Sequence, residues 1–236
     1  MEHRSCGCKS NNRGVKKKMS YNIAIDGPAG AGKSTIAKKV AKDKGFIYVD
    51  TGAMYRAMAL FMLEKKIDLN DVKAIAEMCK SADISIKYED GVQCVYLNGV
   101  NVNDKIRTPE VSAAASKTSV VAEVRQKLVE LQQELAAHES VVMDGRDICT
   151  KVLPNADVKV FLTASVEVRA ERRYKELVEK GMECDLEEIK KDIAERDHRD
   201  MTRAESPLVQ AEDAELVDSS YMTIDEVVEK IKSLCK

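Results

Sequence analysis

Several features are scarce in this sequence, and each shortage excludes a class of protein. Only 11 of the 236 residues are glycine and four are proline, far from the glycine at every third position that collagen needs. No apolar run approaches the roughly 20 residues of a membrane-spanning helix, and the first residues lack the apolar stretch of a secretory signal. We therefore expect a cytoplasmic protein without a membrane partner.

An excess of charge of one sign is also missing. The chain has 38 Lys and Arg against 40 Asp and Glu, for a net charge of -2, which argues against bulk nucleic-acid binding. Apolar residues make up 44% of the sequence and charged residues 33%, as in soluble globular proteins with one sizeable core. The balanced charge predicts no stable nucleic-acid partner. Because no long apolar face is left over for a second subunit, we also expect a monomer.

The cysteines form no pattern typical of disulfides or zinc. They are odd in number and scattered, without a C-x-x-C pair, so we expect reduced thiols. A metal site at Cys6 and Cys8, near His3, is an alternative, but a structural zinc needs about four ligands. Residues 1–18 are polar, basic and without periodicity, and we expect a disordered tail there. A weak nucleic-acid contact through the lysines at 16–18 is the alternative for this tail.

Apolar runs of strand length alternate with segments of helical periodicity. Gly45 is placed to end the first helix, and Thr51 is placed as the N-cap of the second. Two successive βα units predict a five-stranded parallel sheet flanked by helices. Between 81 and 108 the pattern instead alternates and contains D-G and N-G, which are typical of hairpins, so a small antiparallel insert is expected. Parallel strands are predicted at 21–26, 46–50, 140–144, 157–162 and 214–219, and helices at 33–44, 52–66, 71–80, 108–138, 166–180, 186–202 and 223–231.

The segment G-P-A-G-A-G-K-S matches G-x-x-x-x-G-K-[ST] at every fixed position. Its glycines let the backbone curl so that N–H groups and the next helix N-terminus point at a phosphate. Lys33 then reaches the β- and γ-phosphates, and the Ser34 hydroxyl ligates Mg²⁺. The guanine-reading N-K-x-D motif does not occur, and the spacing is not the G-x-G-x-x-G of dinucleotide binders. We predict ATP and Mg²⁺ as cofactors, with ATP bound by Gly27, Pro28, Ala29, Gly30, Ala31, Gly32, Lys33, Ser34 and Thr35.

Three further clusters are rich in arginine, which neutralises phosphates through bidentate hydrogen bonds. Two of them lie at or just after the ends of predicted strands, at the edge where parallel sheets bind ligands. The residues of the third lie on one face of a predicted helix. A solvated, salt-bridged helix face is the alternative for the third cluster. For Arg169, Arg172 and Arg173, both phosphate contact and a surface role stay open. The three clusters are Thr51, Tyr55 and Arg56; Asp144, Arg146 and Asp147; and Arg196, Asp200 and Arg203.

Taken in order, these motifs resemble those of bacterial cytidylate kinases over about residues 20–236. They read G-P-A-G-A-G-K-S-T, V-D-T-G-A-M-Y-R, M-D-G-R-D and E-R-D-x-R-D-x-x-R. The resemblance implies a P-loop NTPase fold of the nucleoside monophosphate kinase type, and ATP-dependent phosphorylation of CMP and dCMP in pyrimidine nucleotide metabolism. It also implies one kinase domain over 19–236, with a core at 20–80, 139–164 and 204–236, an NMP-binding insert at about 81–138 and a helical lid at about 165–185.

The resemblance assigns roles residue by residue. Cytosine is read by Ser116, Arg125 and Asp147, and the ribose is bound by Arg196 and Asp200. The acceptor phosphate is bound by Arg56, Arg146 and Arg203, while Thr51 and Tyr55 line the same pocket. For Asp144 two roles stay open: it orients a water on Mg²⁺, or it belongs to the acceptor site. The residues expected to act in catalysis are Lys33, Arg146, Arg172, Arg173 and Arg203.

Two alternatives stay open on the residues alone. The same fold can phosphorylate another small acceptor, such as UMP, because the glycine loop does not say which molecule receives the phosphate. A non-catalytic ATP-binding module, or a protein that contacts RNA through its basic tail, belongs to a different class. Turnover measured with a panel of nucleoside monophosphates separates these possibilities.

Overall fold

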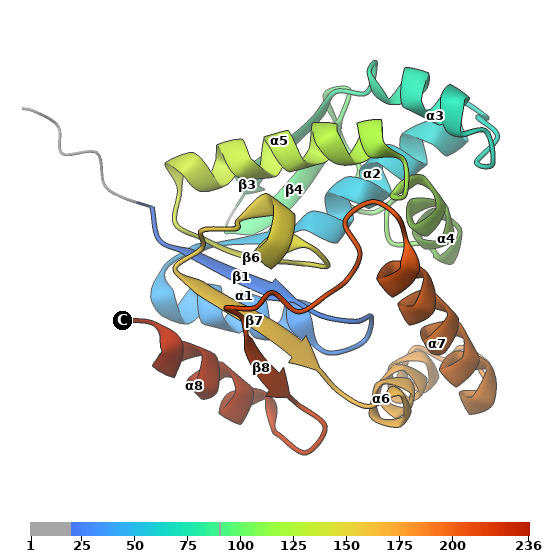
Figure 1. Ribbon diagram of the computed structural model, residues 1–236. Coiled ribbons are helices and arrows are strands. Elements are labelled where there is room, and N and C mark those ends of the chain that lie inside the picture. Colours follow the sequence, from blue (N-terminus) through green and yellow to red (C-terminus); the bar gives the residue numbers. More distant parts are fainter. Residues whose placement is uncertain (1–19, 90) are drawn as a thin grey trace, which may run out of the picture.

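A parallel sheet forms the centre of the protein (Figure 1). The computed structural model describes residues 20–89 and 91–236. The strands lie in the order β2-β6-β1-β7-β8, and every neighbouring pair is parallel, which confirms the five-stranded sheet. Their carboxyl ends therefore meet at one edge. The strands are β1 (Asn22–Asp26), β2 (Ile47–Asp50), β6 (Val141–Gly145), β7 (Val158–Thr163) and β8 (Glu215–Asp218).

Helices cover both faces of this sheet, which explains why its strands read as continuous apolar runs. On one face, α1 (Lys33–Lys44) and α8 (Ile224–Leu234) pack on β1, β7 and β8. On the other, α5 (Ala122–His138) packs together with a short π-helix, η1 (Ile148–Val152), which the sequence did not predict. Gly45 ends α1 with a left-handed φ of 67°, as expected.

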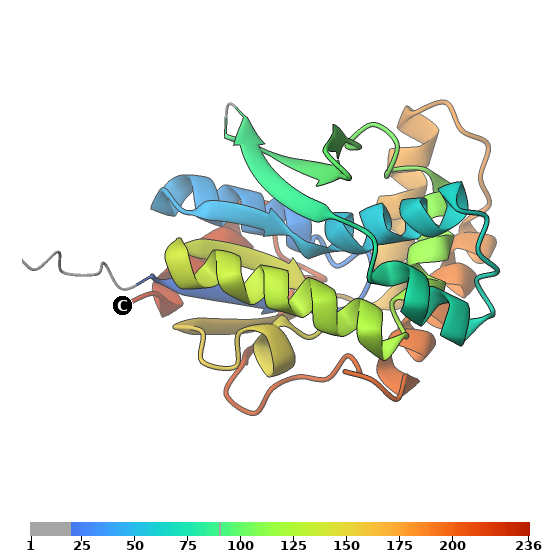
Figure 2. The ribbon, with the colours of Figure 1, turned by 90° about the horizontal axis from the view of Figure 1, so that it is seen from above.

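A second, antiparallel sheet confirms the predicted hairpin insert. It contains β3 (Ile84–Glu89), β4 (Val92–Leu97) and β5 (Val100–Asn101), in that order. Figure 2 shows it lying over the segment that runs from β2 into α2 (Thr51–Glu64). This insert shares an apolar core with α2, α5, α3 (Val72–Cys79) and α4 (Pro109–Thr118).

Two local expectations were wrong. The N-cap of α2 is Asp50, whose carboxylate accepts the Ala53 N–H at 2.9 Å, and Thr51 is the first helical residue. Asp and Thr are both favourable caps, and here the Thr51 hydroxyl instead donates to the Asp144 carbonyl. The helix predicted over 108–138 is divided into α4 and α5. The Arg125 guanidinium donates to the Ser119 carbonyl in the break, a bond that favours a chain turn there.

The remaining helices, α6 (Val166–Glu179) and α7 (Leu186–Thr202), pack against each other through Ala170, Ile189 and Ile193. They lie together beyond the carboxyl edge of the sheet (Figure 1). No helix among the described residues is both long and apolar enough to cross a membrane. The cysteines in this part of the chain are free thiols. The predicted tail, with its metal and nucleic-acid alternatives, lies outside the described residues.

Candidate active site

One cavity of about 750 Å³ opens at the carboxyl edge of the parallel sheet. The glycine loop from Ala29 to Thr35 forms one wall, whereas Gly27 and Pro28 precede the lining. Every residue of the predicted acceptor set lines the same cavity, as do Arg169, Arg172 and Arg173 of α6. This set comprises Thr51, Tyr55, Arg56, Ser116, Arg125, Asp144, Arg146, Asp147, Arg196, Asp200 and Arg203. The structure thus brings together residues from segments that are far apart in the sequence.

The glycine loop adopts a conformation that only glycine permits at its start. Gly27 has a φ of 149°, and a Cβ there would lie 1.9 Å from the Leu162 carbonyl oxygen. Gly32, with a φ of 86°, precedes α1 without any side-chain cap, so the helix N–H groups remain available to an anion. Lys33 is buried and donates to the Pro28 carbonyl at 2.7 Å. Burial and the nearby Arg146 lower the pKa of Lys33.

Oxygen atoms that suit Mg²⁺ lie directly behind the loop. Ser34 Oγ donates to Asp144 Oδ2 at 3.0 Å, and the Tyr48 hydroxyl donates to Asp144 Oδ1 at 2.9 Å. Burial and the neighbouring Asp50 raise the pKa of Asp144, an effect that Lys33 opposes. A hydroxyl and a carboxylate beside a phosphate loop are the oxygen donors that Mg²⁺ prefers, so these residues fit the expected ion.

A group of arginines lines the cavity close to Lys33. Arg146 Nε donates to Asp200 Oδ2 at 2.9 Å, and Arg56 Nη2 donates to Asp50 Oδ2 at 3.0 Å. Arg196 lies among these cations: burial, Arg146 and Arg56 lower its pKa to about 10. Among the described residues, no group accepts a hydrogen bond from Arg196 Nε. Partly buried guanidinium groups that repel one another are stabilised by a bound anion, so this group has the chemistry of a phosphate site.

The opposite end of the cavity contains a buried ion pair between Arg125 and Asp147. The Arg125 guanidinium also lies 5.4 Å from the centre of the Tyr55 ring, within cation–π range. Burial raises the pKa of Tyr55 to about 12. Arg203 lies at this end, with Nη2 3.9 Å from Asp147, and donates to the Ser206 carbonyl. The arrangement presents planar, hydrogen-bonding groups suited to a heterocyclic base.

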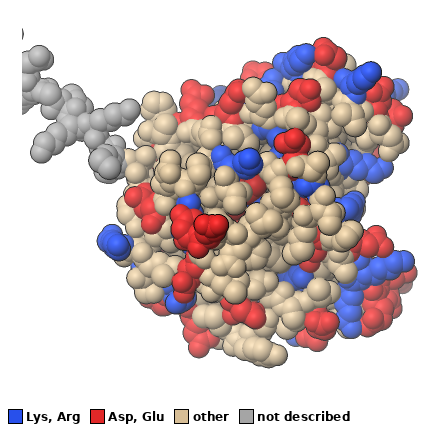
Figure 3. Space-filling model, in the orientation of Figure 1, with Lys and Arg blue, Asp and Glu red and all other residues tan. Residues whose placement is uncertain are grey.

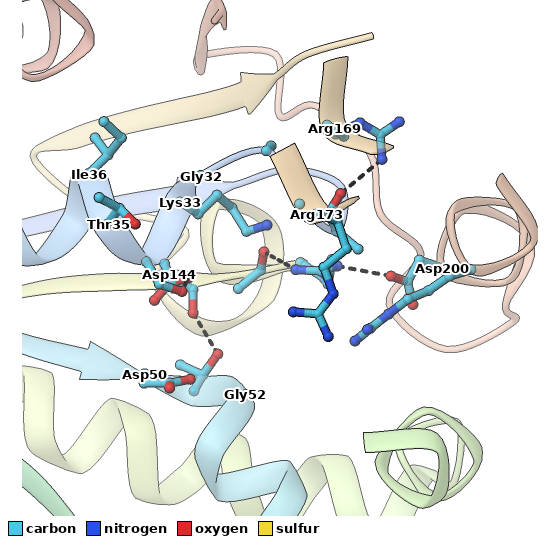
Figure 4. Close-up of a pocket in the computed structure, with 18 of the residues that line it drawn as sticks. Gly32, Lys33, Thr35, Ile36, Asp50, Gly52, Asp144, Arg169, Arg173 and Asp200 are labelled. Carbon is cyan, nitrogen blue, oxygen red and sulfur yellow. Dashed lines mark hydrogen bonds and ion pairs between the residues drawn. The ribbon is translucent and has the colours of Figure 1, made fainter. Parts of the chain in front are cut away.

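The three arginines of α6 contact protein groups around the cavity. Arg172 Nη2 donates to the Ser219 carbonyl at 2.7 Å, and Arg173 Nη1 donates to Glu176 Oε2 at 2.9 Å. Arg169 pairs with Asp197 of α7. Figure 4 shows Arg173 and Asp200 beside the space next to Lys33 and Asp144. Side chains from α6 and α7 therefore reach the same cavity as the glycine loop.

Sequence reasoning missed several lining residues, among them Asp50, Gly52, Ser112 and Glu176, and also Ser219, Met222, Thr223, Ile224 and Val227 after β8. The residues after β8 could have been predicted, because ligands bind beyond the carboxyl ends of parallel strands. On the face of the described residues seen in Figure 3, acidic and basic side chains are interspersed. The arginines of the cavity, by contrast, are concentrated at one place.

Comparison with known proteins identifies close relatives. A family model described as Cytidylate kinase matches residues 23–236. A cytidylate kinase of Caldicellulosiruptor bescii is 54% identical over 90% of this chain and 94% of that protein. One from Shouchella clausii is 52% identical over 92% of this chain and 96% of its own length. One from Streptococcus pneumoniae is 52% identical over 91% of this chain and 96% of its own length.

Proposed function

The chain belongs to the cytidylate kinase family, and we propose that its cavity transfers the γ-phosphoryl group of ATP to CMP and dCMP. The products are ADP and CDP or dCDP. The observation that carries the proposal is that a phosphate loop and an arginine cluster line one cavity. Arg146 lies close enough to Lys33 to lower its pKa. Two anionic substrates bound at these centres would meet between them.

On the donor side, the backbone of the glycine loop and the N-terminus of α1 bind the ATP phosphates. Ser34 and Asp144 would hold Mg²⁺, which neutralises charge on the phosphates when it is bound. Lys33 leaves its contact with the Pro28 carbonyl and binds the γ-phosphate. The hydrogen bond from Tyr48 to Asp144 keeps the carboxylate turned toward Ser34.

On the acceptor side, Arg56, Arg146 and Arg203 bind the CMP phosphate, and Arg196 and Asp200 bind the ribose. The unpaired Nε of Arg196 adds a donor close to that phosphate. Cytosine lies against Tyr55 between Ser116 and the Arg125–Asp147 pair. Its exocyclic amino group is a donor, and the carboxylate of Asp147 is the matching acceptor, so the pocket favours cytosine over uracil.

Transfer proceeds in line, without a covalent intermediate, because positioning and charge neutralisation suffice for this reaction. Lys33 and Arg146 stabilise charge on the transferring group. Residues 165–185 act as a lid. When it closes, Arg172 gives up its hydrogen bond to Ser219 and Arg173 gives up its hydrogen bond to Glu176, and both side chains bind the phosphates instead. Closure of the lid excludes water and so prevents hydrolysis of ATP.

The decisive experiment measures ADP release with CMP, dCMP, UMP, AMP and GMP as acceptors. We expect the highest kcat/KM with CMP or dCMP, and UMP at a lower level. A preference for AMP or GMP contradicts the assignment of the base pocket. ATP binding without ADP release in the presence of any monophosphate indicates a non-catalytic module instead.

We further propose that the enzyme works as a monomer in the cytoplasm, a reducing compartment that suits its free thiols. One chain supplies both the phosphate loop and the arginine cluster of the cavity, so the proposed reaction needs no residue from a second copy. Size-exclusion chromatography with light scattering tests the monomer, and retention of RNA at moderate salt tests the alternative role of the tail.

A further inference from the structure

The carboxyl end of β2 is held by side chains of the β insert, residues 81–108. Within residues 20–89 and 91–236, strand β2 is an edge strand that pairs only with β6, so its outer backbone groups need other partners. The Asp50 N–H donates to Gln93 Oε1 at 2.8 Å, and Gln93 Nε2 donates to the Asp50 carbonyl at 3.2 Å. The Tyr88 hydroxyl donates to the Tyr48 carbonyl at 3.1 Å. One glutamine carboxamide therefore takes the place of a neighbouring strand at Asp50.

Asp50 in turn connects this contact to the acceptor site. Its backbone is held by Gln93, while its carboxylate caps α2 and accepts a hydrogen bond from Arg56 Nη2 at 3.0 Å. Arg107, at the end of the insert, donates to the same oxygen at 3.2 Å. Asp50 and Arg56 are 12% and 19% exposed, whereas Arg107 is 62% exposed. Asp50 and Arg56 also line the cavity, whereas Arg107 is not among the lining residues.

We propose that Gln93 is a positioning residue for the acceptor phosphate, acting through Asp50 on Arg56. This inference rests on the proposed function, in which Arg56 binds the phosphate of CMP. A guanidinium binds a phosphate well only in one orientation, because its donors form a fixed fork. The β insert fixes the Asp50 backbone, Asp50 fixes the Arg56 guanidinium, and the insert thereby helps to set the affinity for the phosphorylated acceptor.

The position of Gln93 in β4 is itself fixed. Asn103 Nδ2 donates to the Gln93 carbonyl at 2.9 Å, and the Val95 N–H donates to Asn103 Oδ1 at 2.9 Å. These bonds join β4 to the chain that follows β5, and Cys94 and Val95 are buried beside Gln93. The carboxamide therefore projects from a strand that is held in place by hydrogen bonds and packing, as a positioning role requires.

The test is Gln93→Leu, which removes both hydrogen bonds to Asp50 and keeps a side chain of similar size. We expect the KM for CMP to rise about tenfold, the change that about one net hydrogen bond makes. The KM for ATP and the inhibition constant of cytidine, which lacks the phosphate, should stay within about twofold. The control is Gln126→Leu on the exposed face of α5, where the side chain bonds only Glu130; this variant should behave as wild type.

A double-mutant comparison tests whether the effect passes through Arg56. In an Arg56→Ala background, Gln93→Leu should produce no further rise in the KM for CMP, because the positioned group is gone. If the two substitutions raise the KM for CMP independently, so that their factors multiply in the double variant, the inference that Gln93 acts through Arg56 is wrong. An equal rise in the cytidine inhibition constant also overturns it, because that result indicates general damage to the pocket.

If Gln93→Leu does not fold, as judged by circular dichroism, Gln93→Glu is the second variant. It keeps the acceptor for the Asp50 N–H but places a charged oxygen, in place of the donor, against the Asp50 carbonyl, and we expect the KM for CMP to rise. An unchanged KM overturns the inference. Failure of the proposed function looks different, because the wild-type protein itself then does not phosphorylate CMP.

Discussion

The Arg169 guanidinium of α6 donates to the carbonyl oxygen of Ala29 in the glycine loop at a distance of 2.9 Å. The same side chain donates to the Ala164 carbonyl at 2.9 Å and pairs with Asp197 of α7 at 2.7 Å. It is only 4% exposed. One buried arginine therefore joins the loop expected to bind ATP to both helices at the mouth of the cavity.

Replacing Arg169 by methionine should reduce the free energy of unfolding by about 3 kcal/mol, because it leaves the charge of Asp197 buried and unpaired. Urea denaturation measures the loss. The double variant Arg169→Met with Asp197→Asn should recover part of it, since the unpaired charge is then removed. A loss below about 1 kcal/mol for Arg169→Met would contradict a structural role for this contact.

The carboxylate of Asp26, at the end of β1, predicts a pH dependence of stability. It accepts the N–H groups of Ile148 and Cys149 at 2.9 and 2.7 Å and is fully buried. Burial raises its pKa from 3.8 to about 6. Since the folded state binds this proton more tightly than the unfolded state, the contribution to stability is present below pH 3.8 and is lost as pH rises through about 6.

We therefore expect Asp26→Asn to gain about 2.5 kcal/mol relative to wild type between pH 4 and pH 7, because the variant does not titrate. Urea denaturation at intervals across this range gives the difference between the two proteins. The absolute stability of the variant also includes the hydrogen bond that the amide loses, so the pH slope is the quantity to compare. Asp104→Asn, at an exposed position, is the control. Parallel slopes for Asp26→Asn and wild type would contradict the raised pKa.

Much of this architecture could be predicted from the sequence because the signals are local. The glycine spacing of the phosphate loop, the apolar strand runs and the D-G and N-G dipeptides depend on a few neighbouring residues. Arg56, Asp144 and Arg146 closely follow predicted parallel strands, and the carboxyl ends of such strands share one ligand-binding edge. That rule alone is enough to bring the three side chains to the same side of the sheet.

What could not be predicted depends on contacts between distant segments. Asp50 and Thr51 are both good caps, and only the position of the Asp144 carbonyl decides that Thr51 bonds there instead. The break between α4 and α5 is accompanied by the bond from Arg125 to Ser119. The contact of Gln93 with Asp50 joins residues that are 43 positions apart, and no periodicity in either segment indicates it.

Lys33→Met should abolish most of the phosphoryl transfer while the fold persists. Loss of a charge that acts on the transferring group is expected to slow transfer by about 10³-fold. Stability should be unchanged or higher, because burial lowers the pKa of Lys33 and methionine removes a desolvated cation. Single-turnover ADP formation and urea denaturation measure the two effects, with Lys42→Met on the exposed face of α1 as the control. Near-normal turnover would exclude the proposed mechanism.

Asp147→Asn should shift the acceptor preference from CMP toward UMP. The carboxylate of Asp147 only accepts hydrogen bonds and so matches the amino group of cytosine, whereas an amide can also donate to the O4 atom of uracil. We expect the ratio of kcat/KM for CMP over UMP to fall about tenfold or more. Because the variant also removes the charge partner of buried Arg125, circular dichroism must show that the protein is folded. A fall in kcat/KM that is equal for both nucleotides would mean that Asp147 supports the pocket without reading the base, since only a residue that contacts the exocyclic group can change the ratio.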